Sequence, residues 1–219
     1  MSLTDEQQDE HVEIMAAICH TFKQKNLPMV LKGGTALKLC YGLDRFSENL
    51  DYDCAIALDL EKTLNAVFAQ LGKRKPHLRN PEISKKKDTT TVRRYRIVYA
   101  GDVNLKLETS LRGTPNDDDL IERNGILTYK ISRLIKQKLS ALKGRTAARD
   151  LHDVVYLYEH YLGDFDNDEL EDINDLYENQ SDILDEYNTA YSEDTILSTS
   201  DLLSDLSKFI DLYKARNHA

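Results

Sequence analysis

The sequence predicts an α/β fold, with a small mixed sheet flanked by helices and an all-helical C-terminal half. Three observations support this prediction. Apolar residues recur at helical spacing near the N-terminus, short apolar or alternating runs follow, and a helical pattern extends from about residue 119 to the end. This order of elements is typical of a mixed domain with a helical appendage, so we expect domains at 1–118 and 119–219.

The first three predicted elements are a helix, a buried strand and a second helix. Residues 4–25 form the first helix because apolar side chains recur every three or four positions, with Thr4 as the N-cap. The apolar run at 28–31 lies between a proline and two glycines, which is typical of a short buried strand. The second helix begins at Thr35 and is closed by Gly42.

Further strands and helices follow in the sequence. Residues 51–58 alternate in the manner of a strand, which places Asp51 and Asp53 on one face and apolar side chains on the other. Beyond them we expect a helix over 60–72 and two strands, 90–99 and 102–110, joined at Ala100-Gly101. Helices follow from about residue 119, with breaks near Gly144, Gly163 and Asn188.

Composition argues against a membrane protein and against a disulfide scaffold. Hydrophobic residues make up 41% of the chain and charged residues 31%, and no apolar run approaches the roughly 20 residues that span a bilayer. The acidic start lacks a secretory pattern, so we expect a cytoplasmic protein. The three cysteines have no CxxC spacing and lie within apolar patterns, which indicates buried thiols: Cys19, Cys40 and Cys54.

The net charge of −9 conceals a strong asymmetry between the two ends of the chain. Residues 1–149 hold 26 Lys and Arg against 19 Asp and Glu, whereas residues 150–219 hold 3 against 19. The first part is therefore basic and the second strongly acidic. Such a division suits a basic half that faces phosphates and an acidic half that stays soluble or repels the wrong surface.

A glycine turn offers a place for a phosphate. At Gly33-Gly34-Thr35 a predicted strand passes into a helix, so backbone N–H groups and the helix N-terminus meet at one point. Glycines let the backbone approach an anion closely. The alternative is a tight turn before a helix, without any ligand.

Three acids on predicted strands indicate a metal site. Asp51 and Asp53 project from one strand face at a spacing that suits one or two Mg²⁺ or Mn²⁺ ions, although an exposed acidic face is the alternative. Such ions would bridge nucleotide phosphates and activate an attacking hydroxyl. Glu108 lies on the polar face of another strand, where it either completes this site or pairs with Lys106.

A later helical segment combines cations and acids. Lys138, Arg145 and Arg149 recur at spacings of seven and four, so they can share one side and reach a triphosphate together. Asp150 and Asp153, on the next turn, can orient these cations. The alternative is a set of helix-surface ion pairs, which contribute little.

Two ordered blocks resemble the signature of the AbiEii/AbiGii-toxin-type nucleotidyltransferases. The first, residues 31–53, reads LKGGTALKLCYGLDRFSENLDYD and contains a KGGTAL turn, an R-x-S element and a D-x-D strand. Position 49 is Asn49 where the family usually has an acid, so one acid outside the metal pair is missing. The second block, about 120–157, contains a K-x-x-A-L run and an R-D-x-x-D element, at Lys138, Ala141, Leu142, Arg149, Asp150 and Asp153.

This resemblance implies a polymerase-beta-type nucleotidyltransferase fold, use of an NTP with Mg²⁺ or Mn²⁺, and the role of toxin in a toxin–antitoxin pair whose characterised members modify tRNA. It implies a nucleotide-binding set at Lys32, Gly33, Gly34, Thr35, Arg45, Ser47, Arg145 and Arg149. The implied catalytic residues are Asp51, Asp53, Lys138, Asp150 and Asp153, and the metal ligands Asp51, Asp53 and Glu108. Lys138 engages the triphosphate, and spacing favours Asp153 over Asp150 as the later functional acid. Residues 1–118 are then the catalytic core, to which the helical region 119–219 contributes.

The acceptor is indicated by a basic segment. Residues 73–96 carry ten Lys and Arg around two prolines, which is a plausible cradle for an RNA backbone, although a solvated, mobile loop is the competing interpretation. We expect tRNA as the acceptor and a winged-helix-type antitoxin as a partner, with no membrane and no DNA. The alternatives are transfer to a small molecule or a protein hydroxyl, and a catalytically silent module that binds RNA or a partner.

One further acidic stretch resembles the start of a calcium loop. The run that begins at Asp164 has Glu169 where such a loop needs glycine, and Asp175 where it needs a bidentate glutamate. We therefore interpret it as an acidic helix N-terminus.

Overall fold

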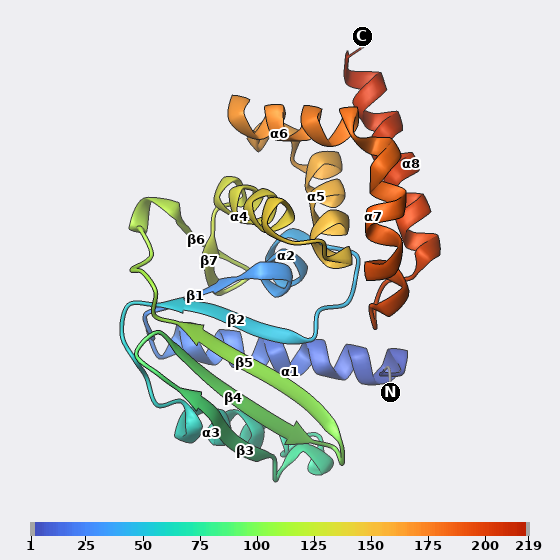
Figure 1. The fold of residues 1–219 in the computed structure, drawn as a ribbon. Helices are drawn as coiled ribbons and strands as arrows, with labels where there is room; N and C mark the ends of the chain where they lie inside the picture. The colour runs from blue at the N-terminus through green and yellow to red at the C-terminus, as the bar shows by residue number, and fades with distance from the viewer. Residues whose placement is uncertain (1–2, 218–219) are drawn as a thin grey trace. The chain divides into compact units, whose positions relative to one another are not determined.

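A computed structural model describes residues 3–217, which form two compact units (Figure 1). The first unit spans Leu3–Lys130 and the second begins at Ile131. The two units differ in class, because the first contains a seven-stranded mixed sheet and the second is helical. The predicted α/β class with a mainly helical C-terminal half is confirmed.

The sheet of the first unit has the strand order β3-β4-β5-β2-β1-β7-β6. Its core is mixed: β1 pairs with β2 antiparallel, whereas β2 with β5 and β1 with β7 are parallel. The strands are β1 (Met29–Lys32), β2 (Asn49–Cys54), β3 (Glu82–Asp88), β4 (Val92–Tyr99), β5 (Val103–Ser110), β6 (Leu120–Arg123) and β7 (Ile126–Tyr129).

Three helices pack against this sheet: α1 (Asp5–Gln24), α2 (Gly33–Tyr41) and α3 (Glu61–Leu71). The predicted cap at Thr4 is confirmed, since its side chain accepts from the Gln7 amide in a capping box. Helices α1 and α3 cover one face, where Tyr52 donates to the Cys19 thiol and Phe68 packs on Tyr99. Figure 1 shows α2 on the other side of β1 and β2 from α1.

The alternation of β2 sorts its side chains by face. Leu50, Tyr52 and Cys54 are buried, while the residues between them, including Asp51 and Asp53, are partly exposed. The predicted faces of the two acids are therefore correct. The predicted extent of the strand, 51–58, is wrong at both ends, because β2 starts at Asn49 and ends at Cys54, before the exposed residues that follow.

Two predictions about strands and helices in the later chain are corrected. The region from about 119 was expected to be helical, but 120–129 form the hairpin β6–β7. Its turn, Asn124-Gly125, has positive φ at both residues, and an Asn-Gly pair between apolar runs is a hairpin signal that the helical interpretation overlooked. Residues 82–88, expected as part of a basic segment, form the edge strand β3.

The second unit contains five α-helices within its described residues: α4 (Ile131–Gly144), α5 (Ala148–His160), α6 (Asn167–Glu178), α7 (Gln180–Glu193) and α8 (Thr199–Asn217). The breaks near Gly144 and Gly163 are confirmed. The break expected at Asn188 is wrong, since this residue lies within α7. The acidic run resembling a calcium loop caps α6 instead, with Asp166 and Glu169 forming a capping box.

The three cysteines are free and buried, as predicted. Burial raises the pKa of each thiol, Cys19, Cys40 and Cys54, to about 12. At neutral pH they are therefore neutral thiols. Across residues 3–217, no helix is both long and apolar enough to span a membrane.

Candidate active site

The glycine turn forms the junction between β1 and α2. Gly33 has φ +72°, a conformation that strains any L side chain, so the sequence needs glycine here. Helix α2 begins at Gly33 with Lys32 as its N-cap, and no side chain caps its first amides. Those amides and the positive end of the helix dipole therefore favour an anion at this turn.

Arg45 lies against the same turn. A Cβ added at Gly34 would stand 2.6 Å from one guanidinium nitrogen of Arg45, so glycine at this position leaves room for the cation. The Arg45 side chain is buried, and its Nη1 donates to the Phe46 carbonyl at 2.9 Å. The turn is thus backed by a fixed positive charge, which adds to its preference for an anion.

Thr35 and Ser47 hold this region together from within. Their hydroxyl oxygens are 2.7 Å apart and both residues are buried. The Thr35 hydroxyl also donates to the Asn49 carbonyl, so Ser47 must be the donor to Thr35. In this arrangement the two hydroxyls tie the start of α2 to the start of β2, and their predicted contact with phosphates stays a prediction.

The acid pair is neutralised on one side by a lysine. Asp51 and Asp53 lie on one face of β2, and Lys32 on β1 lies directly across from Asp51. The Lys32 ammonium nonetheless reaches Asp53, 2.6 Å from Oδ1, while Tyr129 of β7 donates to Oδ2 at 2.8 Å. Asp53 is therefore engaged through both oxygens. Gly33 lies close by, since a Cβ there would be 3.9 Å from Asp51 Oδ2.

Glu108 joins the same sheet face. In the parallel pairing of β2 with β5, Glu108 is the register partner of Asp51, which puts the two acids side by side. Its charge partner is Arg94 on β4, with Nη2 2.6 Å from Oε2, rather than the predicted alternative Lys106. Sequence reasoning missed Arg94 and Tyr129 as partners of the acids, because only strand order brings them there.

The donor set of this face fits a hard divalent cation. Carboxylate oxygens are the ligands that Mg²⁺ and Mn²⁺ prefer, and Asp51, Asp53 and Glu108 supply them from adjacent strands. Within residues 3–217, no three His, Cys, Asp or Glu side chains converge as a ready-made metal site. Lysine and arginine contacts explain this, since Lys32 holds Asp53 and Arg94 holds Glu108. A metal ion would have to compete with these cations.

A second acid–cation cluster lies within the second unit. The Lys138 ammonium is 3.0 Å from Asp150 Oδ1 and 2.6 Å from Asp153 Oδ2, and Arg145 Nη2 is 2.7 Å from Asp150 Oδ2. Both aspartates are almost fully buried, so these are not the surface pairs of the alternative interpretation. Arg149 pairs with Asp194, with its Nε 2.8 Å from Oδ2.

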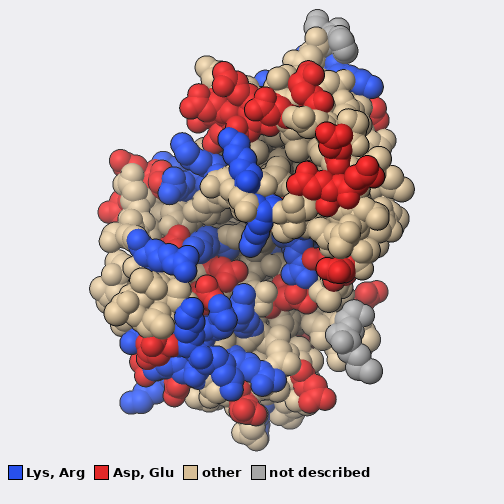
Figure 2. All heavy atoms as spheres, in the orientation of Figure 1, with Lys and Arg blue, Asp and Glu red and all other residues tan. Residues whose placement is uncertain are grey.

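The basic segment 73–96 is part strand and part turn, since residues 82–88 and 92–96 lie in β3 and β4. Part of it faces the acid side of the sheet, since Arg94 and Arg96 are register partners of Glu108 and Lys106. A cavity of about 650 Å³ is lined there by Lys86, Arg94, Arg96 and Lys106, among others. Figure 2 shows Lys and Arg side chains gathered over β3, β4 and β5.

Comparison with known proteins places the chain in a family. The chain matches the family model described as nucleotidyl transferase AbiEii toxin, type IV TA system, over residues 14–215. A protein from H. pylori described as a candidate nucleotidyltransferase is 33% identical, with a TM-score of 0.79 over 97% of this chain and 95% of that one. JHP933 from Helicobacter pylori is 31% identical, with a TM-score of 0.78 over 99% of this chain and 97% of that one.

A more distant structure shares the fold. MenT4, a nucleotidyltransferase toxin from Mycobacterium tuberculosis H37Rv, is 14% identical, with a TM-score of 0.54 over 96% of this chain and 88% of that one. Among curated proteins the sequence has no significant match. The chain belongs to the AbiEii family of nucleotidyltransferases, which are the toxins of type IV toxin–antitoxin systems. A toxin of this kind implies an antitoxin partner.

Proposed function

We propose that the chain transfers a nucleotide from an NTP to an RNA acceptor, tRNA, with the help of Mg²⁺ or Mn²⁺. The observation that carries the proposal is the sheet face on which Asp51, Asp53 and Glu108 lie side by side, next to the Gly33 turn. An anion-binding turn beside three carboxylates is what a metal–triphosphate complex requires. We also propose a winged-helix-type antitoxin and a cytoplasmic location, where NTPs and tRNA are found.

The turn and the acids have different tasks in this proposal. The free amides of α2 at Gly33 and Gly34 bind phosphate oxygens, and Arg45 supplies a fixed positive charge behind them. Asp51 and Asp53 would hold the metal ion, with Glu108 as the third acid. When bound, the ion neutralises charge that develops on the phosphates and activates the attacking hydroxyl.

A role in the reaction is also proposed for the second unit. The Lys138 ammonium contacts both Asp150 and Asp153, and a lysine held by two acids is fixed in orientation. We propose that Lys138 engages the triphosphate and that Asp153 is the acid that orients it.

An RNA acceptor is supported by the charge of the open sheet face. Several cations of the 73–96 segment already have acidic partners, such as Lys75 with Glu10 and Glu13. Arg96 instead contacts the neutral side chain of Asn104 and is exposed. Arg96 and its neighbour Lys106 both line the cavity of about 650 Å³ on this face. These cations lie next to Glu108 and can bind an RNA backbone as it approaches the acids.

The transfer itself is tested with purified protein, Mg²⁺, each labelled NTP in turn and total tRNA. We expect label transfer with one or more NTPs and its loss in Asp51→Ala. Absence of transfer with every NTP, or transfer that survives Asp51→Ala, would refute the proposal. Asp9→Asn serves as the control, because Asp9 is an exposed acid on α1.

The acceptor is tested separately by charge reversal. Arg96→Glu combined with Lys106→Glu is expected to weaken tRNA binding and to lower its salt dependence by roughly one log–log unit per lost phosphate contact. The matched control is Lys25→Glu with Lys62→Glu, which makes the same charge change at exposed residues outside the sheet and outside the 73–96 segment. Equal effects of the two pairs would contradict binding on this face.

A further inference from the structure

Asp53, one acid of the proposed metal pair, is engaged through both of its carboxylate oxygens. Its Oδ1 accepts from the Lys32 ammonium at 2.6 Å and its Oδ2 accepts from the Tyr129 hydroxyl at 2.8 Å. The first partner is charged and the second is neutral. Lys32 lies on β1 and Tyr129 on β7, whereas Asp53 lies on β2, so the pairing of strands in the sheet places both partners beside this carboxylate.

We infer that Lys32 is a positioning residue that takes the place of the metal at Asp53 and moves to the nucleotide when the metal binds. The inference rests on the proposed function, because it presumes a divalent cation at Asp51 and Asp53. A divalent cation and the Lys32 ammonium repel each other strongly at hydrogen-bonding distance. They therefore compete for Asp53, and each weakens the binding of the other.

Tyr129 has no such conflict with a metal ion. Its hydroxyl is neutral, and a carboxylate oxygen that accepts one hydrogen bond keeps a second lone pair. The residue is buried, and its backbone carbonyl accepts from the Tyr41 hydroxyl at 2.6 Å. Tyr129 therefore stays in place and fixes the orientation of Asp53 while the cation partner changes.

The position of Lys32 gives its ammonium a second destination. Lys32 ends β1 and is the N-cap of α2, so it immediately precedes the turn proposed to hold phosphates. Its side chain is about one-third exposed and carries the ammonium on a flexible four-carbon stem. When a metal ion replaces the Lys32 ammonium, the charge of Asp53 stays neutralised. The released Lys32 ammonium can then pair with the triphosphate.

The first test measures metal binding without any nucleotide. Mn²⁺ binding is followed by electron paramagnetic resonance for the wild-type chain and for Lys32→Met, with folding checked by circular dichroism. We expect Lys32→Met to bind Mn²⁺ roughly tenfold more tightly or better, because the competing charge is gone. Lys32→Arg, which keeps the charge, is expected to remain close to wild type.

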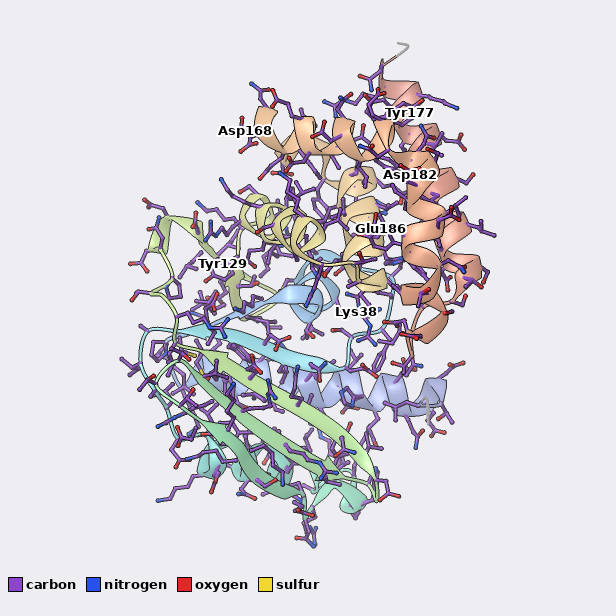
Figure 3. All side chains as sticks on the ribbon, in the orientation of Figure 1. Lys38, Tyr129, Asp168, Tyr177, Asp182 and Glu186 are labelled. Carbon is purple, nitrogen blue, oxygen red and sulfur yellow. The ribbon has the colours of Figure 1, made fainter. Side chains whose placement is uncertain are left out.

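Lys38→Met is the matched control. Lys38 lies on α2 in the same strand–turn–helix unit, and its ammonium donates to the Asp44 carbonyl at 3.4 Å rather than to a site carboxylate (Figure 3). The change in net charge is the same as in Lys32→Met. An equal gain in Mn²⁺ affinity would mean that overall charge, and not the Asp53 contact, controls binding, and would overturn the inference.

The second test measures nucleotide binding at saturating Mn²⁺, by displacement of a fluorescent NTP. Here Lys32→Met is expected to bind NTP roughly tenfold more weakly, because one charge-assisted contact to phosphate is lost. A merely structural role for Lys32 would not shift the two affinities in opposite directions. An unchanged or tighter NTP affinity would overturn the inference.

Asp51→Ala separates this inference from the proposed function. If Asp51→Ala binds Mn²⁺ like the wild-type chain, the proposed metal pair itself is wrong. If Asp51→Ala loses Mn²⁺ but Lys32→Met binds it no more tightly than wild type, only the role of Lys32 is overturned. Absence of Mn²⁺ binding by both the wild-type chain and Lys32→Met overturns both.

Discussion

The chain contains two clusters in which aspartates meet cations, and they differ in burial. Asp53 and its partner Lys32 in the first unit are both partly exposed, with side chains 19% and 30% accessible. Asp153 and Lys138 in the second unit are 0% and 11% accessible. Water can replace a lost partner in the first cluster, whereas in the second an unpaired charge would stay buried.

The difference separates a site whose cations can be exchanged from one whose cations are fixed. A partly exposed ion pair contributes less to stability than a buried one, so a metal ion can displace its lysine at lower cost. A buried pair is strongly coupled, and removal of either member leaves the other unsatisfied. The first cluster therefore has the character of a binding site, while the second must also hold its helices together.

The largest effect is expected for Asp53→Asn. Transfer should fall by roughly 10³-fold, because charge stabilisation at the reacting phosphates is lost, while the free energy of unfolding changes by less than about 1 kcal/mol. Transfer is measured with labelled NTP and tRNA, and unfolding with urea. A large loss of stability together with activity would show that the first cluster is structural and would break the comparison.

Asp153→Asn is expected to act on stability first. Loss of the buried partner of Lys138 should lower the free energy of unfolding by roughly 3–5 kcal/mol. Urea unfolding measures this loss, and a change below about 1 kcal/mol would contradict the assignment of a fixed cluster. At a temperature where the variant stays folded, the transfer assay also tests the predicted catalytic role, for which we expect a loss of activity.

Gly33→Ala is expected to have an intermediate effect. An alanine at φ +72° costs roughly 1–2 kcal/mol, and the turn beside the exchangeable cluster would distort. Thermal unfolding and NTP binding report the two consequences. Gly113→Ala is the control, because a Cβ there meets no atom within 4 Å, and it should change stability by less than about 0.5 kcal/mol.

The smallest effect is expected for Lys143→Ala. Lys143 pairs with Asp172 in the second unit, but its side chain is 63% exposed, so the loss should be below about 1 kcal/mol. Urea unfolding beside Asp153→Asn compares an exposed and a buried pair within one unit. Similar losses from the two variants would show that burial does not distinguish them.

The amino-acid sequence alone placed much of the first cluster. The strand–glycine–helix turn at Gly33 and the shared face of Asp51 and Asp53 follow from local periodicity, which depends on near neighbours in the chain. Local pattern also misleads, since the helical pattern predicted from about residue 119 covers the short strands β6 and β7, whose turn is marked by Asn124-Gly125.

Only the tertiary structure decided which cation pairs with which acid. Asp53 is contacted by Lys32 from β1 and by Tyr129 from β7, and Glu108 is contacted by Arg94 from β4. These strands are close to the acids because of the strand order in the sheet, and not because of their distance in the sequence. Burial was decided in the same way, because the spacing of Lys138 and Asp153 on helices cannot tell a solvated pair from one enclosed by packing. Periodicity fixes the face on which a side chain lies, and long-range packing fixes what it meets there.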